Sequence, residues 1–151
     1  MDSTDIKILD LLQKDATLNA SQIAEAVNLS KTPCWRRIQN LEKQGLIEKR
    51  VALLNREKLD RGMDVFVTIR TNQHNASWFK KFSNIVDGFP EVVEFYRMSG
   101  QIDYLLRVVV RDMKAYDRFY QRLIEKIDIN DVNSNFAMEQ IKYTTAIPIV
   151  R

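Results

Sequence analysis

The sequence predicts an α+β chain in two parts, a helical N-terminal part and a C-terminal part with the order βαββαβ. Two changes along the chain support this prediction. Apolar residues recur at helical spacing up to about residue 45, whereas from residue 63 they alternate as in a strand. Between the two patterns lies the polar, charged stretch 55–62, which a glycine closes. We therefore expect one domain over residues 1–54, a linker over 55–62 and a second domain over 63–151.

Composition restricts the class of protein. The chain has 151 residues, of which 45% are hydrophobic and 28% charged, enough for a packed core in a soluble protein. No apolar run reaches the length of a membrane span, and the N-terminus lacks the pattern of a signal peptide, so a cytoplasmic protein is expected. The single cysteine, Cys34, excludes an intramolecular disulfide and a multi-cysteine metal site. It falls on the inner face of a predicted helix, which indicates a small core residue.

The N-terminal part predicts three helices. The first covers residues 4–14. A shorter one follows Asn19, whose side chain and that of Gln22 have the spacing of a capping box. The third begins after Ser30, a good N-cap whose hydroxyl is expected to accept a hydrogen bond from the backbone N–H of Thr32. Because a short helix, a tight turn and a longer helix follow one another, the segment has the helix-turn-helix arrangement.

The third helix has a dry inner face and a polar outer face. Cys34, Ile38 and Leu41 recur at helical spacing on the inside, and Gly45 is expected to end the helix in a left-handed conformation. Cations, hydroxyls and an amide on the outside are groups that contact phosphates and base edges. The alternative for this face is a solvated cationic surface. The candidate DNA-contacting residues are Ser30, Lys31, Thr32, Trp35, Arg36, Arg37, Gln39 and Lys43.

Two further features favour DNA binding. The apolar segments 46–47 and 51–54 bracket three charged residues, as a short β-wing does, so the predicted domain is a winged helix-turn-helix. Charge is also uneven: residues 1–30 carry a net charge of −3, and residues 31–50 carry +4. If about four cations of each helix-turn-helix domain neutralise phosphates, the logarithm of the DNA association constant falls with the logarithm of the salt concentration, with a slope of roughly −3.6 per domain. Trp35 has two readings, stacking on DNA or folding back onto Pro33.

The C-terminal part predicts a ferredoxin-like fold. Its elements are a strand at 63–71, a helix at 76–87 capped by Asn75 and stopped by Gly88, strands at 92–98 and 104–110 joined by a loop at 99–102, a helix at 113–127 capped by Asp112, and a strand at 132–143. This order gives an antiparallel sheet with two helices on one face. The other face is expected to be apolar, because neighbouring strand residues such as Leu105 and Leu106 are both apolar. An uncovered apolar face predicts a homodimer, which also suits paired DNA-binding heads.

The chain resembles the Lrp/AsnC family of feast/famine transcription regulators. The resemblance rests on DIKILDLLQKD, IAEAVNLSKTPCWRRIQNLEKQGLI, VALLN and SGQIDYLL, in order along the whole chain. It implies a helix-turn-helix head on a ferredoxin-like ligand domain, dimers that commonly assemble as octamers, free amino acids as effectors, and control of genes of amino-acid metabolism. FYRMSGQIDYLLRV, DMKAYDRFY and FAMEQIKYTT are most similar to the cysteine-responsive branch, which implies cysteine as the effector.

The same resemblance implies an effector site at the glycine loop and the last strand. Gly100 permits close backbone approach, and its neighbours offer N–H groups to an α-carboxylate. Asp103 is the expected partner of an α-ammonium group. Gln101 stands where an acidic residue is common in the family, which affects charge-based selectivity. Alternatively, Asp103 only caps the hairpin and Gly100 only serves its turn. The candidate effector residues are Ser99, Gly100, Gln101, Asp103, Ser134 and Phe136.

Two other functions were weighed. An enzyme needs a nucleophile, a base or a metal cluster, and the sequence has no such constellation, so neither catalysis nor a cofactor is expected. His74, the only histidine, is expected to be a solvent-facing loop residue. The second alternative is an architectural DNA-wrapping protein without an effector. Only the loop around Gly100 argues against it.

Overall fold

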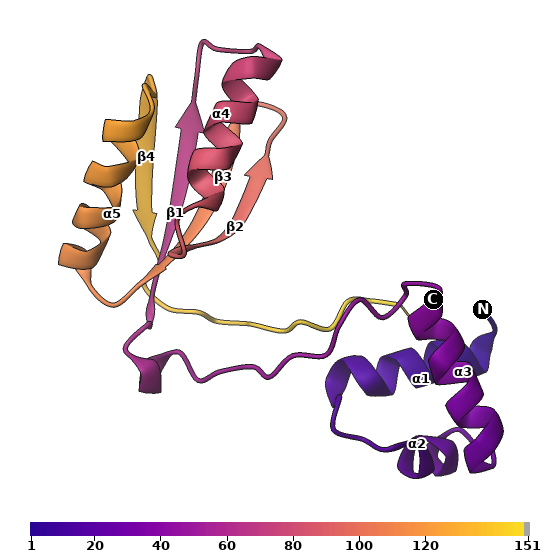
Figure 1. The fold of residues 1–151 in the computed structure, drawn as a ribbon. Helices are drawn as coiled ribbons and strands as arrows, with labels where there is room; N and C mark the ends of the chain where they lie inside the picture. Colours follow the sequence, from indigo (N-terminus) through magenta and orange to yellow (C-terminus); the bar gives the residue numbers. More distant parts are fainter. Residues whose placement is uncertain (150–151) are drawn as a thin grey trace. The chain divides into compact units, whose positions relative to one another are not determined.

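The computed structural model describes residues 1–149, which form two compact units (Figure 1). The first unit comprises Met1–Leu53 together with the described residues from 141 onward, and the second comprises Leu54–Gln140. Among the helices that the structure describes, none is long and apolar enough to cross a membrane.

The first unit contains three helices, α1 (Ser3–Lys14), α2 (Ala20–Ala26) and α3 (Lys31–Lys43) (Figure 1). A capping box opens each of the first two. Asp2 caps α1 with Asp5, and Asn19 caps α2 with Gln22, as the sequence predicts. Inward-facing residues of all three helices form one small aliphatic core: Ile8, Leu12, Ile23, Ala24, Cys34, Ile38 and Leu41.

Left-handed residues end both helices of the helix-turn-helix. Asn28 has φ 56°, and the next residue, Leu29, donates its N–H to the Ala24 carbonyl at 2.8 Å. Gly45 has φ 72°, and Leu46 donates to the Leu41 carbonyl at 3.1 Å. Both are Schellman motifs, which satisfy the last carbonyls of a helix. The prediction for Gly45 is confirmed, and Asn28 fixes the tight turn between α2 and α3.

Two local features of the first unit differ from the prediction in detail. Ser30 is the N-cap of α3, but its side chain makes no capping bond. The third helical position is Pro33, so a usual donor for that hydroxyl is absent. The segment 46–54, which the sequence assigns to the wing, forms no regular strand in the described structure. It contains no glycine, proline or asparagine to reverse the chain into a hairpin.

The first unit also includes the C-terminal segment. The side-chain amide of Gln13 on α1 makes two hydrogen bonds to the backbone of Ile147: it donates to the carbonyl and accepts from the N–H, each at 3.0 Å. This pair of bonds resembles one rung of a β-ladder and fixes the segment beside α1.

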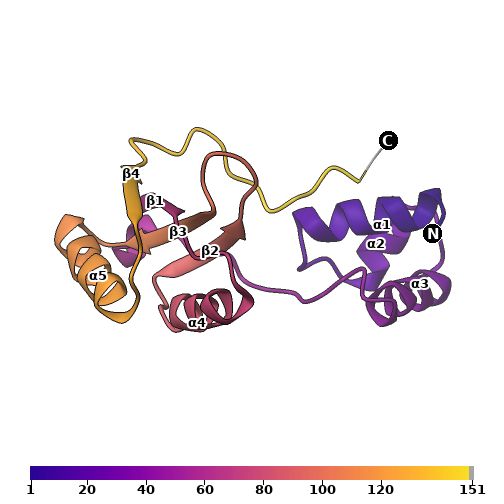
Figure 2. The same ribbon diagram turned by 90° about the horizontal axis from the view of Figure 1, so that it is seen from above.

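The second unit is a four-stranded antiparallel sheet with the order β2-β3-β1-β4, covered on one face by two helices (Figures 1 and 2). The predicted ferredoxin-like fold is confirmed. Its elements are a 3-10 turn η1 (Glu57–Leu59), β1 (Met63–Arg70), α4 (Ala76–Asp87), β2 (Val92–Arg97), β3 (Tyr104–Val110), α5 (Met113–Lys126) and β4 (Asp131–Phe136). Asn75 and Asp112 cap α4 and α5 as predicted.

The core of the second unit lies between the sheet and the two helices. Alternate residues of β1 and β3 point into it, among them Val65, Val67, Leu106 and Val108, and meet Phe82 of α4 and other aromatic residues. The predicted final strand, 132–143, is too long, because β4 ends at Phe136. Phe136 pairs with Val65, and beyond it the Ala137 N–H still donates to the Asp64 carbonyl at 3.0 Å. Because β1 begins at Met63, the residues after Ala137 have almost no partner strand left to pair with.

A β-bulge interrupts the pairing of β2 with β3. Val92 lies opposite Val108, but the next paired residue is Glu94, opposite Arg107. Val93 is therefore the extra residue, and its side chain is 52% exposed. Past the bulge, Phe95 faces the core, where its ring meets Phe82 edge to face at 5.4 Å between centroids. Glu94 and Tyr96 point to the opposite, uncovered face of the sheet.

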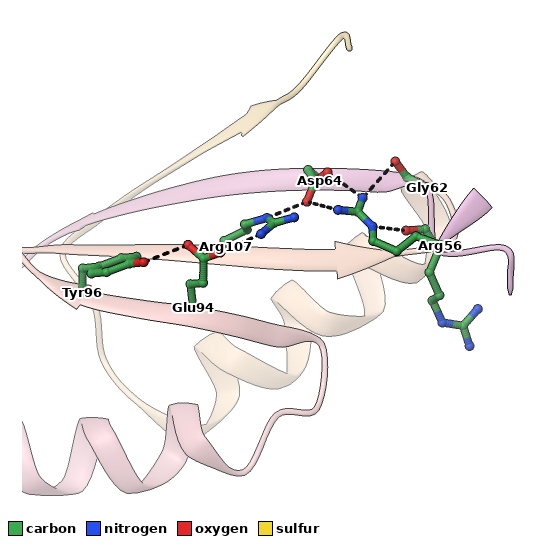
Figure 3. Close-up of polar contacts among 7 residues, drawn as sticks. Arg56, Gly62, Asp64, Glu94, Tyr96 and Arg107 are labelled. Atoms are coloured by element: carbon green, nitrogen blue, oxygen red, sulfur yellow. Dashed lines mark hydrogen bonds and ion pairs between the residues drawn. The ribbon is translucent and has the colours of Figure 1, made fainter. Parts of the chain in front are cut away.

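The uncovered face carries an ion network (Figure 3). The Asp64 carboxylate accepts from Arg56 Nη2 at 2.6 Å and from Arg107 Nε at 2.8 Å. Arg107 also donates to Glu94 at 2.6 Å, and the Tyr96 hydroxyl donates to Glu94 at 3.0 Å. Burial of Asp64 acts to raise its pKa, but the bonds from the two arginines outweigh it, so the pKa lies below its ordinary value of 3.8.

This network corrects the prediction of an apolar second face. Leu105 and Val109 are indeed on it, together with exposed Phe66 and Tyr96, but Leu106 and Val108 point to the helices. The face is therefore mixed: apolar residues surround a buried carboxylate that is neutralised by arginine.

The predicted linker, 55–62, is tied to the sheet. Besides bonding Asp64, the Arg56 guanidinium donates to the carbonyls of Arg61 at 3.3 Å and Gly62 at 3.4 Å (Figure 3). Since η1 also lies in this stretch, it has fixed local structure within the second unit.

Candidate nucleic-acid interface and ligand pocket

The outer face of α3 is exposed and rich in cations. Because the buried residues of α3 recur on one side, the opposite side is left to solvent, and Trp35 there is 52% exposed. The exposed side of α3 and its N-cap include seven of the eight predicted DNA-contacting residues: Ser30, Lys31, Thr32, Trp35, Arg36, Gln39 and Lys43. We call this set the α3 front.

The structure does not bring Arg37 to the α3 front. Its Nη1 atom donates to Asp2 and to Asp5 at the start of α1, each at 2.8 Å. The pKa of Asp2 lies below its ordinary value, chiefly because its carboxylate accepts the Asp5 backbone N–H and also because Arg37 donates to it. The same carboxylates raise the pKa of Arg37. Arg37 therefore joins α3 to the start of α1.

An acid lies beside the α3 front. Glu42 accepts a hydrogen bond from Gln39 at 3.1 Å and forms an ion pair with Arg50 at 2.9 Å. By contrast, among the residues that the structure describes, no carboxylate lies within ion-pair distance of Lys31, Arg36 or Lys43. These three cations remain available to phosphates or base edges.

A polar pocket of about 400 Å³ lies at the edge of the sheet where β1 ends and β3 begins. It is lined by three of the predicted effector residues, Gly100, Gln101 and Asp103. Gly100 has φ 115°, a conformation that favours glycine, although a side chain would meet no atom there. Further lining residues are Arg70, Thr71, Asn72, His74, Asn130 and Asp131.

Asp103 is built into this pocket by backbone bonds. Its carboxylate oxygen Oδ2 accepts the Thr71 N–H at 2.8 Å, its N–H bonds the Ile69 carbonyl at 2.9 Å, and its own carbonyl accepts from Met98 at 2.8 Å. The Asp103 carboxylate therefore caps the end of β1, whereas the β2–β3 hairpin is closed by the backbone bond from Met98. The bond from Thr71 uses Oδ2 alone, so Oδ1 can accept a hydrogen bond from a ligand.

Ser134 and Phe136 lie on the covered face of the sheet and do not line this pocket. Ser134 is opposite Val67, and its hydroxyl shares a hydrogen bond with that of Tyr116 on α5. Phe136 meets the Tyr116 ring edge to face, at 5.2 Å between centroids. Their position follows from strand alternation, because every second residue of β4 points to the covered face and both Ser134 and Phe136 are among these residues. Ser99, also predicted, is exposed next to Gly100.

The sequence analysis missed several pocket residues. A second pocket, of about 310 Å³, shares His74 and Asp103 with the first and is lined on its other side by Phe79, Met98 and Tyr104. His74 therefore borders both pockets. The signal was topological: in an antiparallel sheet the end of β1, the start of β3 and the start of β4 meet at one edge.

Within residues 1–149 there is no group of three His, Cys, Asp or Glu side chains that could hold a metal ion. Cys34 is buried in the helical core, as predicted, and burial raises the pKa of its thiol although Arg37 acts in the opposite direction.

The two units match two known domain families. Residues 1–48 match a winged helix-turn-helix DNA-binding domain, and residues 64–147 match the Lrp/AsnC ligand-binding domain. The chain belongs to the Lrp/AsnC family. The resemblance seen in the sequence is confirmed, and with it a DNA-binding transcriptional regulator that carries a ligand-binding domain.

Individual relatives agree with this assignment over nearly the full length. The DNA-binding transcriptional activator DecR of Escherichia coli K12 is 51% identical over 150 residues, 99% of each chain. The glutamate uptake regulatory protein of Zymomonas mobilis is 46% identical over 149 residues, 99% of this chain and 91% of the relative. The first of these relatives is named as a transcriptional activator and the second as a regulatory protein.

Solved structures give the same result. An AsnC family regulator from Agrobacterium tumefaciens, 60% identical, superposes with a TM-score of 0.96 and covers 99% of this chain and 97% of its own. A transcriptional regulator from Neisseria meningitidis, in complex with L-Met, is 33% identical, with a TM-score of 0.94 and the same coverage. A relative of this fold therefore binds a free amino acid.

Proposed function

We propose that this regulator reads operator DNA with the α3 front and senses a free amino acid at the Gly100 pocket. The DNA half of the proposal rests on one observation. Within residues 1–149, Lys31, Arg36 and Lys43 have no ion-pair partner, and they lie on the exposed side of the second helix of a helix-turn-helix. In such domains that helix enters the major groove. Arg36 and Gln39 can donate to base edges, and Lys31 and Lys43 to phosphates.

The amino-acid half rests on the free oxygen of Asp103. We assign Asp103 to the α-ammonium group and the N–H groups around Gly100 to the α-carboxylate. The adjoining space beside Phe79, Met98 and Tyr104 then suits the side chain of the effector. Similarity of the Gly100 region to the cysteine-responsive branch favours cysteine, and the name of the relative DecR favours activation of transcription.

Self-association completes the proposal. A second copy packed on the uncovered sheet face would cover Phe66 and Tyr96 and pair two heads on one operator, as dimeric helix-turn-helix proteins do. Octamers then form from dimers, as the family resemblance implies. A regulator that acts on chromosomal DNA is expected to work in the cytoplasm.

The test of the DNA half is the double variant Arg36→Ala/Gln39→Ala. We expect its affinity for operator DNA to fall by at least a hundredfold, to that for unrelated duplexes, because two base-reading side chains are lost. Gel shift and footprinting measure this, and sedimentation should show an unchanged assembly. Lys7→Ala, an exposed cation on α1, is the matched control. Retained footprints in the double variant would disprove the assignment.

The test of the amino-acid half is a thermal-shift screen of the twenty amino acids. A ligand that binds only the folded state raises the midpoint of thermal unfolding. At a ligand concentration a hundred times its Kd, the free energy of unfolding increases by about 2.7 kcal/mol. Asp103→Asn should abolish the shift while an amide oxygen still accepts the Thr71 N–H, so the loop keeps its cap. Asp87→Asn, at the exposed end of α4, is the control. If no amino acid shifts the midpoint or alters DNA binding, the architectural alternative is favoured.

A further inference from the structure

A second cationic surface lies on the ligand-binding unit, away from the Gly100 pocket. A pocket of about 600 Å³ beside α5 is lined by four arginines, one from the segment before β1, one after β3 and two from α5. These are Arg61, Arg111, Arg118 and Arg122. Two acids, Glu91 and Asp117, also line it.

Only part of this positive charge is neutralised locally. Arg122 is paired with Glu91, and Arg111 with Asp112 at 2.9 Å. Arg61 donates to its neighbouring backbone carbonyls, at 2.8 Å to Asp60. Within the described structure, Arg118 has no carboxylate at ion-pair distance. The pocket therefore retains charge for an anion.

The charge also extends along α5. Cations recur at every fourth position, so they follow one side of the helix with a rise of roughly 6 Å between neighbours, and all four are exposed: Lys114, Arg118, Arg122 and Lys126. Like charges four residues apart destabilise a helix slightly, so an ordinary solvated helix would be expected to mix the signs along this row. We call this row, with Arg61 and Arg111, the α5 surface.

Two members of the row are held in place by an aromatic ring. The guanidinium carbon of Arg122 lies 5.3 Å from the Phe89 ring centroid, and Lys126 Nζ lies 5.0 Å from it. These cation–π contacts fix the side chains against the buried ring. Arg118 and Lys114 have no such anchor and extend from the exposed side of α5.

We propose that the α5 surface binds the phosphate backbone of duplex DNA as a second, sequence-independent contact. An elongated row of cations matches a polyanion, which carries phosphates at regular intervals along each strand, better than a single small anion. The inference rests on the proposed DNA binding by the α3 front. It adds a contact that strengthens binding to every duplex equally, since phosphates carry no sequence information.

The test is the double variant Lys114→Gln/Arg118→Gln, which leaves the cations packed on Phe89 intact. Each lost phosphate contact should reduce the salt slope of log K by about 0.9 and weaken binding at 0.1 M salt by roughly tenfold. Operator and unrelated duplexes should be affected by the same factor. Lys80→Gln/Lys81→Gln, two exposed cations on α4, is the charge-matched control.

The outcomes separate this inference from the proposed function. If the α5 variant binds DNA like the α4 control, the second contact is disproved, whereas the loss of operator preference in Arg36→Ala/Gln39→Ala tests the α3 front independently. Tripolyphosphate provides a further arm. Suppose that tripolyphosphate raises the unfolding temperature of the native chain but not of the α5 variant, and that the DNA salt slope of the α5 variant equals that of the α4 control. This result would assign the surface to a small anion and overturn the DNA proposal.

Discussion

The α3 front and the uncovered face of the sheet both carry arginines, but the two regions hold them differently. On the sheet, Arg56 and Arg107 are bound by a carboxylate whose side chain is only 6% exposed. On α3, Arg36 projects from an exposed position without a carboxylate partner in the described structure. A paired, buried arginine stabilises the fold, whereas an unpaired, exposed one is available to a ligand. Charge pairing, more than charge number, separates the cations that stabilise the fold from those that we propose contact DNA.

Among the variants that test this difference between paired and unpaired arginines, the largest effect is expected from Asp64 on the sheet. Asp64→Asn leaves the Arg56 guanidinium without its carboxylate partner and leaves Arg107, whose side chain is only 12% exposed, with Glu94 alone. Removing one partner of a buried ion pair is strongly destabilising, so we expect a loss of roughly 3 kcal/mol in the free energy of unfolding. Urea denaturation of the full chain measures it. An unchanged midpoint would mean that the network does not stabilise the sheet.

The same residue predicts a pH dependence. The folded-state pKa of Asp64 is below 3.8, so its contribution to stability is complete above that value and is lost as pH falls through the folded pKa. The stability difference between the native chain and Asp64→Asn should therefore shrink as pH is lowered below 3.8. Urea midpoints of both proteins across this range test it, and a constant difference would contradict it.

An intermediate effect is expected in the turn that presents α3. Asn28 has φ 56°, a conformation that costs an L-residue without a short polar side chain roughly 1–2 kcal/mol. Asn28→Ala should lower the stability of the first unit by about 1 kcal/mol, while Asn28→Gly should leave it nearly unchanged. Thermal unfolding of the pair distinguishes backbone strain from a lost side-chain contact, because both variants lack the amide.

The smallest effect is expected at the ion pair of the first unit. Asp2 is exposed, so Asp2→Asn should barely change the urea midpoint, in contrast to Asp64→Asn. Arg37 keeps Asp5 as a partner at 2.8 Å, and DNA affinity should not fall. A marked loss of DNA binding in this variant would show that the position of α3 depends on Asp2.

Sequence reasoning succeeded where the deciding interactions are short in range. The capping box of Asn19 and Gln22, the left-handed Gly45 and the alternation in β1 are set by residues within a few positions, and each is confirmed. It failed at Ser30, where Pro33 removes a usual donor. It also overextended β4, whose end depends on a strand more than sixty residues away in the sequence.

The candidate sites show the same limit. Exposure of the α3 front follows from helical periodicity, but the pairing of Arg37 with Asp2 joins residues 35 positions apart and has no local signal. For the Gly100 pocket, the family resemblance implied the loop, whereas the inclusion of His74 and the exclusion of Ser134 depend on strand register. Register is determined by the whole sheet.

The bulge in β2 has a consequence for how the chain tolerates changes in length. Val93 is left out of the ladder, so a protein lacking only Val93 should keep Glu94 beside Arg107 and Phe95 against Phe82. Removing Phe95 or Tyr96 would instead shift the parity of the residues on one side of the gap and exchange side chains between the two faces. Position 93 is thus the point in this strand where an ancestral or engineered deletion is expected to be silent.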